Sequence, residues 1–485
     1  MPFCYKITLA LLVCTVCFAL TFNVPTAAQS NEQPNFIFFL TDDVSPDDLG
    51  CYGGNAAHTP HIDQMAEEGM LFTRSMLTIS SCSPSRCSTI TGRYPHNTGA
   101  PELHTSLPEG HFMFPQALRE AGYYTALSGK NHMGGAVNPA FDLISGGKGP
   151  GREADWVEIL AERPQDQPFF CWFASTDAHR DWAISDEGHI HDPDEAQVPP
   201  FLYDGPDTRQ DLADYYHEVS RTDHYLGELR AELERQGIAD NTYILYTSDN
   251  GRPFPRCKTR LYDSGIQSPM VVCGPTVQAG VKTDSLISSI DVAATILNLA
   301  GLPIDPRVQG VSFAPVLADP NAVVRDVAFA EHNWHVFQAH ERMVFHGDWL
   351  YIRNAYPERL NMCVESAPAF PAGEEIWDAH EQGLLNESQI DLFAVPRAAE
   401  ELYSVGDDPY QLTNIAEEHS DVVAEMRTLL DRWTEETGDT IPENPTPDRE
   451  KPDRTSIPGF HRGEMPGEST EATKINAKGP VLLDD

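Results

Sequence analysis

The stretch Phe-Ile-Phe-Phe-Leu-Thr-Asp-Asp at residues 36–43 decides how the first half of the chain is interpreted. Its first five residues form a continuous apolar run, which is typical of a strand buried on both faces of a sheet. Similar runs occupy residues 125–128, 169–173 and 243–246, and helix-like segments such as residues 211–236 lie between them. Buried strands that alternate with helices predict an α/β fold with a large, mostly parallel sheet flanked by helices.

We expect this sheet to form a domain over residues 29–325 and a smaller α+β domain to follow over residues 326–440. The smaller domain has strand-like pieces at residues 343–345 and 349–352 and a helical stretch at residues 421–434. Residues 441–485 form an acidic, Pro-rich tail with few apolar residues. Such a composition indicates either disorder or a segment that wraps the surface.

Residues 1–28 have the features of an export signal. Lys6 supplies a positive charge, residues 7–22 form an apolar run, and small residues offer a cleavage site after Ala28. The alternative is a membrane anchor, but the run is short for a spanning helix. No later stretch is long and apolar enough to span a bilayer. We therefore predict a secreted or periplasmic protein that has no transmembrane segment after signal removal.

The formal net charge of the chain is −40 at pH 7, and no basic stripe is visible along it. A nucleic-acid-binding protein needs such a stripe, so we expect no nucleic-acid partner. The acidity would slow the encounter with a polyanionic substrate, unless strong salt screens the repulsion. Work in saline surroundings is therefore one hypothesis.

Ten cysteines are present, and three of them lie in the predicted export signal. An exported protein can form disulfides, but the seven remaining cysteines are odd in number and cannot be paired from the sequence. No Cys-x-x-Cys pair with zinc-like partners is left among the seven.

Polar residues follow two of the predicted strands directly. Asp42 and Asp43 come after the first strand, and Asp249 and Asn250 come after the strand at residues 243–246. Ligands bind at the carboxyl ends of strands in such sheets, and hard divalent cations prefer oxygen ligands. The alternative is that both motifs are ordinary turn residues.

The segment Cys82-Ser83-Pro84-Ser85-Arg86, followed by Thr91-Gly92-Arg93, suits a turn that enters a helix. A reactive group there would lie near a helix amino terminus, which favours negative charge, and Arg86 could stabilise that charge. The alternative is a structural cysteine beside a turn.

Residues 82–93 resemble the signature of the type I sulfatase family, in which the signature cysteine is oxidised to formylglycine. Four further segments are similar to family motifs at the expected places. They are residues 128–134 with Lys130 and His132, residues 177–180 with His179 and Arg180, residues 248–251, and Lys258 with residues 261–265. Residues 401–403 with Asp408-Pro409 resemble the family's C-terminal signature. The resemblance implies an alkaline-phosphatase-like sheet.

The resemblance also implies a role for each matched residue. A single Ca²⁺ would be bound by Asp42, Asp43, Asp249 and Asn250, with residue 82 close to it. A formylglycine-generating enzyme would convert Cys82, and the hydrate of the aldehyde would attack sulfur. Arg86 and Lys130 would hold the hydrate, and His132 would help regenerate the aldehyde. His179 would assist the leaving group, and Lys258 would bind sulfate oxygens.

The resemblance implies a sulfated carbohydrate as the substrate, and the motifs are most similar to the heparan N-sulfatase branch. Lys258 departs from that branch, in which Arg is expected, and Asp263-Ser264-Gly265 departs from the family's usual Glu-Gly-Gly. N-sulfoglucosamine and O-sulfated polysaccharides or oligosaccharides are thus both compatible. Candidate sugar-binding residues are Arg180, Asp181, Trp182, His332 and His335, although Trp182 could equally serve packing.

Three other functions stay open at this point. A phosphonate or phosphate diester hydrolase shares the fold and signature. A non-catalytic sugar-binding relative would fit if Cys82 is never oxidised. A choline- or aryl-sulfate enzyme would have a small, closed pocket.

Overall fold

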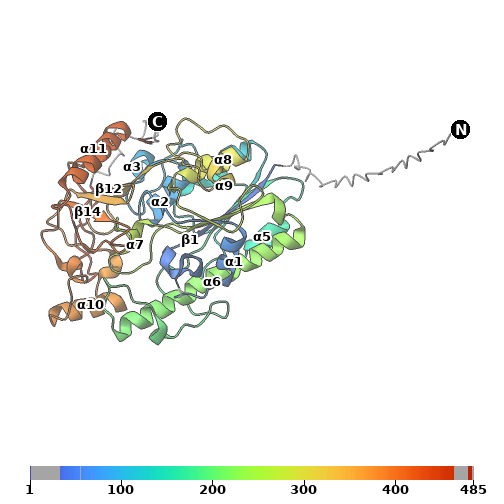
Figure 1. Cartoon of the computed structure of the whole chain (residues 1–485). Helices are drawn as coiled ribbons and strands as arrows, with labels where there is room; N and C mark the ends of the chain where they lie inside the picture. Colours follow the sequence, from blue (N-terminus) through green and yellow to red (C-terminus); the bar gives the residue numbers. More distant parts are fainter. Residues whose placement is uncertain (2–32, 55, 464–478, 483–485) are drawn as a thin grey trace. The chain divides into compact units, whose positions relative to one another are not determined.

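The apolar run at residues 36–40 becomes β1 (Asn35–Thr41), a central strand of an eight-stranded sheet in the computed structural model (Figure 1). The strand order is β5-β4-β6-β1-β7-β8-β2-β9. The first five strands in this order run parallel, whereas β8 runs antiparallel to β7 and β2. The mostly parallel sheet that the sequence predicts is therefore confirmed. The other strands are β2 (Met70–Phe72), β4 (Tyr124–Gly129), β5 (Leu143–Ser145), β6 (Phe169–Ala174), β7 (Thr242–Ser248), β8 (Met270–Cys273) and β9 (Val281–Thr283).

The structure describes residues 1, 33–54, 56–463 and 479–482. Apart from Met1, the predicted export signal lies outside the described residues, and so do its three cysteines. The seven cysteines within them are free thiols. Among the described helices, none has the length and apolar character that crossing a membrane requires.

Side chains of the central strands alternate between two apolar layers, one on each face of the sheet. On β1, Phe36 and Phe38 pack into one layer and Ile37 and Phe39 into the other. The first layer is covered by α2 (Cys82–Thr91), α4 (Phe114–Glu120), α8 (Asp291–Leu299) and α9 (Ala314–Ala318). The second layer is covered by α1 (Pro60–Glu68), α5 (Trp156–Glu162) and α6 (Pro206–Gln236), as Figure 1 shows. Because both faces are covered, the strands need the continuous apolar runs seen in the sequence.

A smaller antiparallel sheet follows, as the fold prediction requires. Its order is β11-β12-β13-β14, with bounds Val327–His332, Glu341–His346, Trp349–Asn354 and Glu400–Ser404. One face packs on residues that precede this sheet in the sequence, such as Tyr262 and Ile266. The other face is covered by α11 (Ser420–Thr437), through side chains such as Leu430 and Trp433.

The remaining short elements connect these layers. They are β3 (Ser75–Met76), β10 (Ile287–Ser288), α3 (Pro95–Thr98), α7 (Asp263–Ile266) and α10 (Pro371–Glu381). In the described part of the Pro-rich C-terminal segment, Phe460 stacks on Trp334 with 5.6 Å between ring centroids. The backbone NH of Arg449 donates to Val336 O at 2.8 Å. This part of the segment therefore packs against the loop after β11.

Candidate active site

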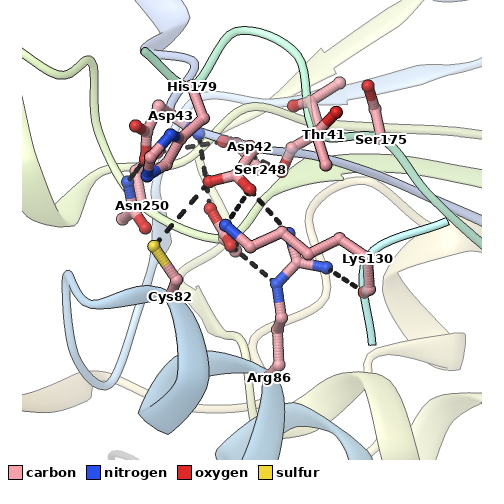
Figure 2. Close-up of polar contacts among 12 residues, drawn as sticks. Thr41, Asp42, Asp43, Cys82, Arg86, Lys130, Ser175, His179, Ser248 and Asn250 are labelled. Atoms are coloured by element: carbon pink, nitrogen blue, oxygen red, sulfur yellow. Dashed lines mark hydrogen bonds and ion pairs between the residues drawn. The ribbon is translucent and has the colours of Figure 1, made fainter. Parts of the chain in front are cut away.

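The polar residues that follow the central strands meet at the carboxyl edge of the sheet (Figure 2). The neighbouring parallel strands β1 and β7 are followed by Asp42-Asp43 and Asp249-Asn250. Lys130 follows β4, and His179 lies in the loop after β6. Backbone hydrogen bonds fix the loops, since Asp249 NH donates to Thr41 O at 3.1 Å and Ala178 NH donates to Asp42 O at 2.6 Å.

Cys82 is the first residue of α2, so its side chain lies at the amino end of a ten-residue helix. This end of a helix favours negative charge. The Cys82 Sγ atom is 3.8 Å from Asp42 Oδ1, and ligand atoms of Cys82, Asp42 and Asp43 all lie within 4.8 Å of one another. Burial raises the pKa of the Cys82 thiol to about 12. An unconverted Cys82 is therefore a neutral thiol and a weak nucleophile.

Three buried carboxylates face three cations at this edge. Arg86 bonds to Asp249 at 2.8 Å and to Asp42 at 3.3 Å. Figure 2 also shows Lys130 bonded to Asp42. Lys258 pairs with Asp43 at 2.7 Å. The cluster is thus close to neutral on its own, and a further divalent cation would make it a positively charged site for an anion.

The directions of the pKa shifts show that the neighbouring cations do not fully offset the cost of burying these carboxylates. Burial alone would raise the pKa of Asp42, but Lys130 and Arg86 hold it below its usual value. Burial raises the pKa of Asp43 well above its usual value although Lys258 opposes the shift. Burial and the neighbouring Asp42 likewise raise the pKa of Asp249. An additional cation at this cluster would lower both raised values and stabilise the ionised forms.

Asn250 provides a direct test of whether the cluster fits a metal ion. Its Nδ2 donates to Asp43 Oδ1 and to Gly251 O, whereas its Oδ1 is buried and has no hydrogen-bond partner among the described residues. A buried amide oxygen without a partner is costly and rare. Together with the three carboxylates it forms an all-oxygen donor set of the kind that Ca²⁺ prefers. The described residues therefore fit the predicted calcium ion.

Two histidines border the charged cluster, and both are neutral near pH 7. Lys258, together with burial, lowers the pKa of His179 to about 3. Burial, Lys130 and Arg86 lower the pKa of His132 to about 2. Because the Nδ1 of His179 bonds to Arg180 O, which can only accept, this nitrogen carries the proton and Nε2 has a free lone pair.

A cavity of about 730 Å³ opens beside the cluster. Lys130, His132 and His179 line it, so these three predicted catalytic residues reach the space in which a substrate would lie, whereas Cys82 and Arg86 do not line it. Its wall also contains His104, Arg152 and Glu218, which the sequence did not single out. These three lie on separate segments with no local motif, and only the tertiary structure brings them together.

Arg180 lies on this wall, but its guanidinium group forms hydrogen bonds with other parts of the protein. Both terminal nitrogens donate to the carboxylate of Asp211 at 2.6 Å, and Nε donates to Pro253 O at 3.0 Å. The indole NH of Trp182 also donates to Asp211, and its ring packs near Phe254. Trp182 thus makes the packing contacts that its alternative role requires, whereas the substrate-binding roles of Trp182 and Arg180 stay predictions.

His332 and His335 are buried and do not line this cavity, so its geometry gives no support to the sugar contact predicted for them, which stays a prediction. His332 is 3% exposed and accepts from Arg260 at 3.0 Å. His335 is 5% exposed, and its Nδ1 lies 2.7 Å from Ser81 Oγ. Sequence position alone could not separate these interior histidines from His179, because burial is set by loops distant in sequence. Asp181 is exposed and lines the cavity.

Known proteins resemble this chain over most of its length. The sulfatase family model matches residues 34–144 and 154–302. The chain is 27% identical to an ulvan-active sulfatase of Formosa agariphila, over 85% of this chain and 77% of that protein. It is also 27% identical to the human N-sulphoglucosamine sulphohydrolase, over 84% of this chain and 90% of that protein.

Solved structures show the same fold. One is a protein in complex with its substrate D-glucosamine-2-N,6-O-disulfate, with a TM-score of 0.66, 20% identity and coverage of 83% and 98% of the two chains. Another is the phosphonate monoester hydrolase of Agrobacterium radiobacter, with a TM-score of 0.63, 18% identity and coverage of 82% and 95%. Because the family model covers more than half of the sequence, the chain belongs to the sulfatase family of sulfuric ester hydrolases.

Proposed function

We propose that this sulfatase removes sulfate groups from sulfated carbohydrates, after Cys82 has been converted to formylglycine and Ca²⁺ has bound to the oxygen cluster. The observation that carries the proposal is the convergence of Cys82, three carboxylates and the unpartnered Asn250 Oδ1 at one strand edge. The metal would be held by Asp42, Asp43, Asp249 and Asn250.

When bound, the metal and the aldehyde hydrate supply charge neutralisation and a nucleophilic hydroxyl that a plain cysteine lacks. The chain's own cations orient and neutralise the sulfuryl group. Arg86 is fully buried and held between two carboxylates, so its position is fixed before substrate arrives. Lys258 is 1% exposed and pairs with Asp43, and it would bind sulfate oxygens.

His179 is suited to the leaving group. Its Nε2 has a free lone pair, and Lys258 is the main cause of its lowered pKa. A bound sulfuryl group brings negative charge next to Lys258 and offsets that repulsion. His179 Nε2 can then hold the proton that a departing alkoxide or amine nitrogen needs.

A sugar is the substrate class that we favour. The relatives are named for ulvan and for N-sulphoglucosamine, which are both carbohydrates. A cavity of about 730 Å³ suits a ligand of sugar size better than the small, closed pocket of an aryl- or choline-sulfate enzyme. The presence of both relatives keeps O-sulfate and N-sulfate substrates within the proposal.

Maturation and export complete the proposal. Cys82 is 2% exposed, so a formylglycine-generating enzyme must reach it before the chain has folded. The predicted export signal would then direct the protein to the periplasm or outside the cell.

The experiment measures sulfate release after co-expression with a formylglycine-generating enzyme. Substrates are N-sulfoglucosamine, heparin fragments and sulfated algal oligosaccharides, and Cys82→Ala is the control. Release from N-sulfoglucosamine that the variant loses would make the enzyme a sulfamidase, and release from O-sulfated sugars alone would make it a polysaccharide sulfatase. No release from any sugar, with residue 82 converted, would contradict the proposal and favour a phosphonate or diester substrate.

A further inference from the structure

A second histidine contacts the predicted catalytic His132. The Nδ1 of His104 lies 2.8 Å from the Nε2 of His132, and the ring centroids are 4.9 Å apart. Both rings line the cavity beside the charged cluster. Since burial lowers the pKa of each imidazole, the pair is neutral, and one hydrogen atom lies between the two nitrogens.

This hydrogen bond decides which nitrogen of His132 is a base. The other nitrogen of His132, Nδ1, is buried and has no hydrogen-bond partner in the part of the chain that the structure describes. If His132 Nε2 donates to His104, then Nδ1 has a free lone pair and can accept a proton from a reacting hydroxyl. If His104 donates instead, Nδ1 carries a hydrogen and cannot accept.

His104 is itself fixed from the side of the signature helix. Its backbone NH donates to Ser83 Oγ at 2.8 Å, one residue beyond Cys82. Its φ of 62° lies in the left-handed region, which few residues other than glycine adopt without support. The loop that carries His104 must therefore be held in place by its surroundings.

The C-terminal segment supplies that support. Arg462 donates to Glu102 at 3.1 Å, to Leu103 O at 2.6 Å and to Thr105 Oγ1 at 3.2 Å, so it bonds to residues on both sides of His104. Thr446 Oγ1 adds hydrogen bonds of 2.9 Å to the Glu102 carboxylate, which is 2% exposed. The acidic, Pro-rich segment thus reaches from the smaller sheet to the rim of the active site.

We propose that His104 is a positioning residue that fixes the base tautomer of His132, and that the C-terminal segment holds His104 in place through Arg462. This proposal rests on the proposed function, because the desulfation step supplies the proton that His132 accepts. In the desulfation step, the O–H bond of the hydroxyl on residue 82 breaks, and the proton moves to His132 Nδ1. The remaining electron pair forms the aldehyde C=O as the C–O bond to sulfate breaks and sulfate leaves.

The kinetic test compares His104→Leu with His104→Asn in protein whose residue 82 is converted. The leucine cannot accept a hydrogen bond, and loss of a partner that orients a functional imidazole costs about tenfold to a hundredfold. We expect kcat to fall by that factor with KM nearly unchanged. Asparagine can accept through Oδ1, so His104→Asn should recover most of kcat. An unchanged kcat in His104→Leu would overturn the proposal.

The role of the C-terminal segment is tested with Arg462→Met. We expect a fall in kcat of about tenfold at constant KM, because the loop around His104 loses its anchor. The matched control is Arg454→Met, which removes an arginine of the same segment that pairs with Glu450 at 2.8 Å. Equal kcat values in the two variants would overturn the role of Arg462.

A second readout does not need activity. In protein labelled with ¹⁵N-histidine, NMR spectra report which nitrogen of His132 carries hydrogen, with assignment by His132→Asn. We expect an Nε2–H tautomer in the wild type and a change in His104→Leu. The same tautomer in both proteins would contradict the inference. If the wild type releases no sulfate but shows the tautomer change, the proposed function fails while the positioning role stands.

Discussion

The buried cluster around Cys82 and the cavity beside it compensate their charges in different ways. In the cluster, each of three carboxylates bonds to a lysine or arginine that is itself almost fully buried. Among the described residues, the exposed side chain of Arg152 in the cavity wall makes no hydrogen bond or ion pair, and the buried Glu218 Oε2 has no hydrogen-bond partner. The cluster is thus built for one fixed chemistry, whereas the wall leaves polar groups available for a substrate.

The strongest test of the cluster is Asn250→Leu, which keeps the side-chain size and removes the unpartnered Oδ1. We expect sulfate release to fall by about a thousandfold, because charge stabilisation at the reacting group is lost. Calcium should raise the Tm of the wild type and leave that of the variant unchanged, as measured by scanning fluorimetry.

The matched control for this variant is Asn298→Leu, which changes an exposed asparagine on α8. A calcium-induced rise in Tm that survives in Asn250→Leu would show that the ion binds elsewhere.

Arg180→Met tests whether this arginine binds substrate or stabilises the fold. The substitution leaves the Asp211 carboxylate, which is 0% exposed, without its bidentate partner. We expect the free energy of unfolding, measured in urea, to fall by about 3 kcal/mol. Arg209→Met, which removes an exposed pair with Asp204, is the control. Unchanged stability with a raised KM would instead support the substrate-binding role.

Glu218→Gln tests whether a carboxyl group of the cavity wall makes the stability of the protein depend on pH. Burial, with help from Asp177, raises the pKa of Glu218 from 4.5 to about 8. Between these values the folded protein holds a proton that the unfolded chain has released, so stability falls as pH rises through this window. Within the window we expect the wild type to lose about 1.4 kcal/mol of stability per pH unit from this group. Urea denaturation of Glu218→Gln should show a flatter pH dependence, and parallel curves for both proteins would refute the shift.

Arg152→Ala should have the smallest effect and should depend on the substrate. A single exposed ion pair contributes up to about 1 kcal/mol. We expect KM to rise about threefold to fivefold for sugars with a second anionic group and to stay constant for monosulfated sugars. The control is Lys148→Ala on the same loop, because Lys148 already pairs with Glu158 at 2.6 Å. An equal rise in KM for both substrate classes would exclude a specific contact.

The same difference explains what the sequence could predict. Asp42 and Asp249 directly follow buried parallel strands, so local sequence places both at one edge of the sheet. Cys82 and Arg86 lie one helical turn apart in a continuous motif. His104 carries no such signal, because it meets His132 only when α2, the loop at residues 102–105 and the C-terminal segment have assembled.

The fold follows the same pattern. The bounds of β1 and β6 agree with the predicted runs at residues 36–40 and 169–173 to within one residue at each end. A short, continuous apolar run between polar segments is typical of a strand buried on both faces of a sheet. The helix predicted from residue 211 begins five residues earlier, at Pro206. Proline is common at the first position of a helix, because its missing NH needs no partner there. The division into domains at residue 325 stays a prediction.

The most direct measurement relates the rate of sulfate release to the fraction of chains that carry formylglycine at residue 82. Peptide mass spectrometry gives that fraction, and ion chromatography gives the rate, on the same batches prepared with different amounts of maturing enzyme. We predict a proportional relation that passes through zero. Sulfate release by unconverted protein, or its absence from fully converted protein supplied with calcium, would contradict the account.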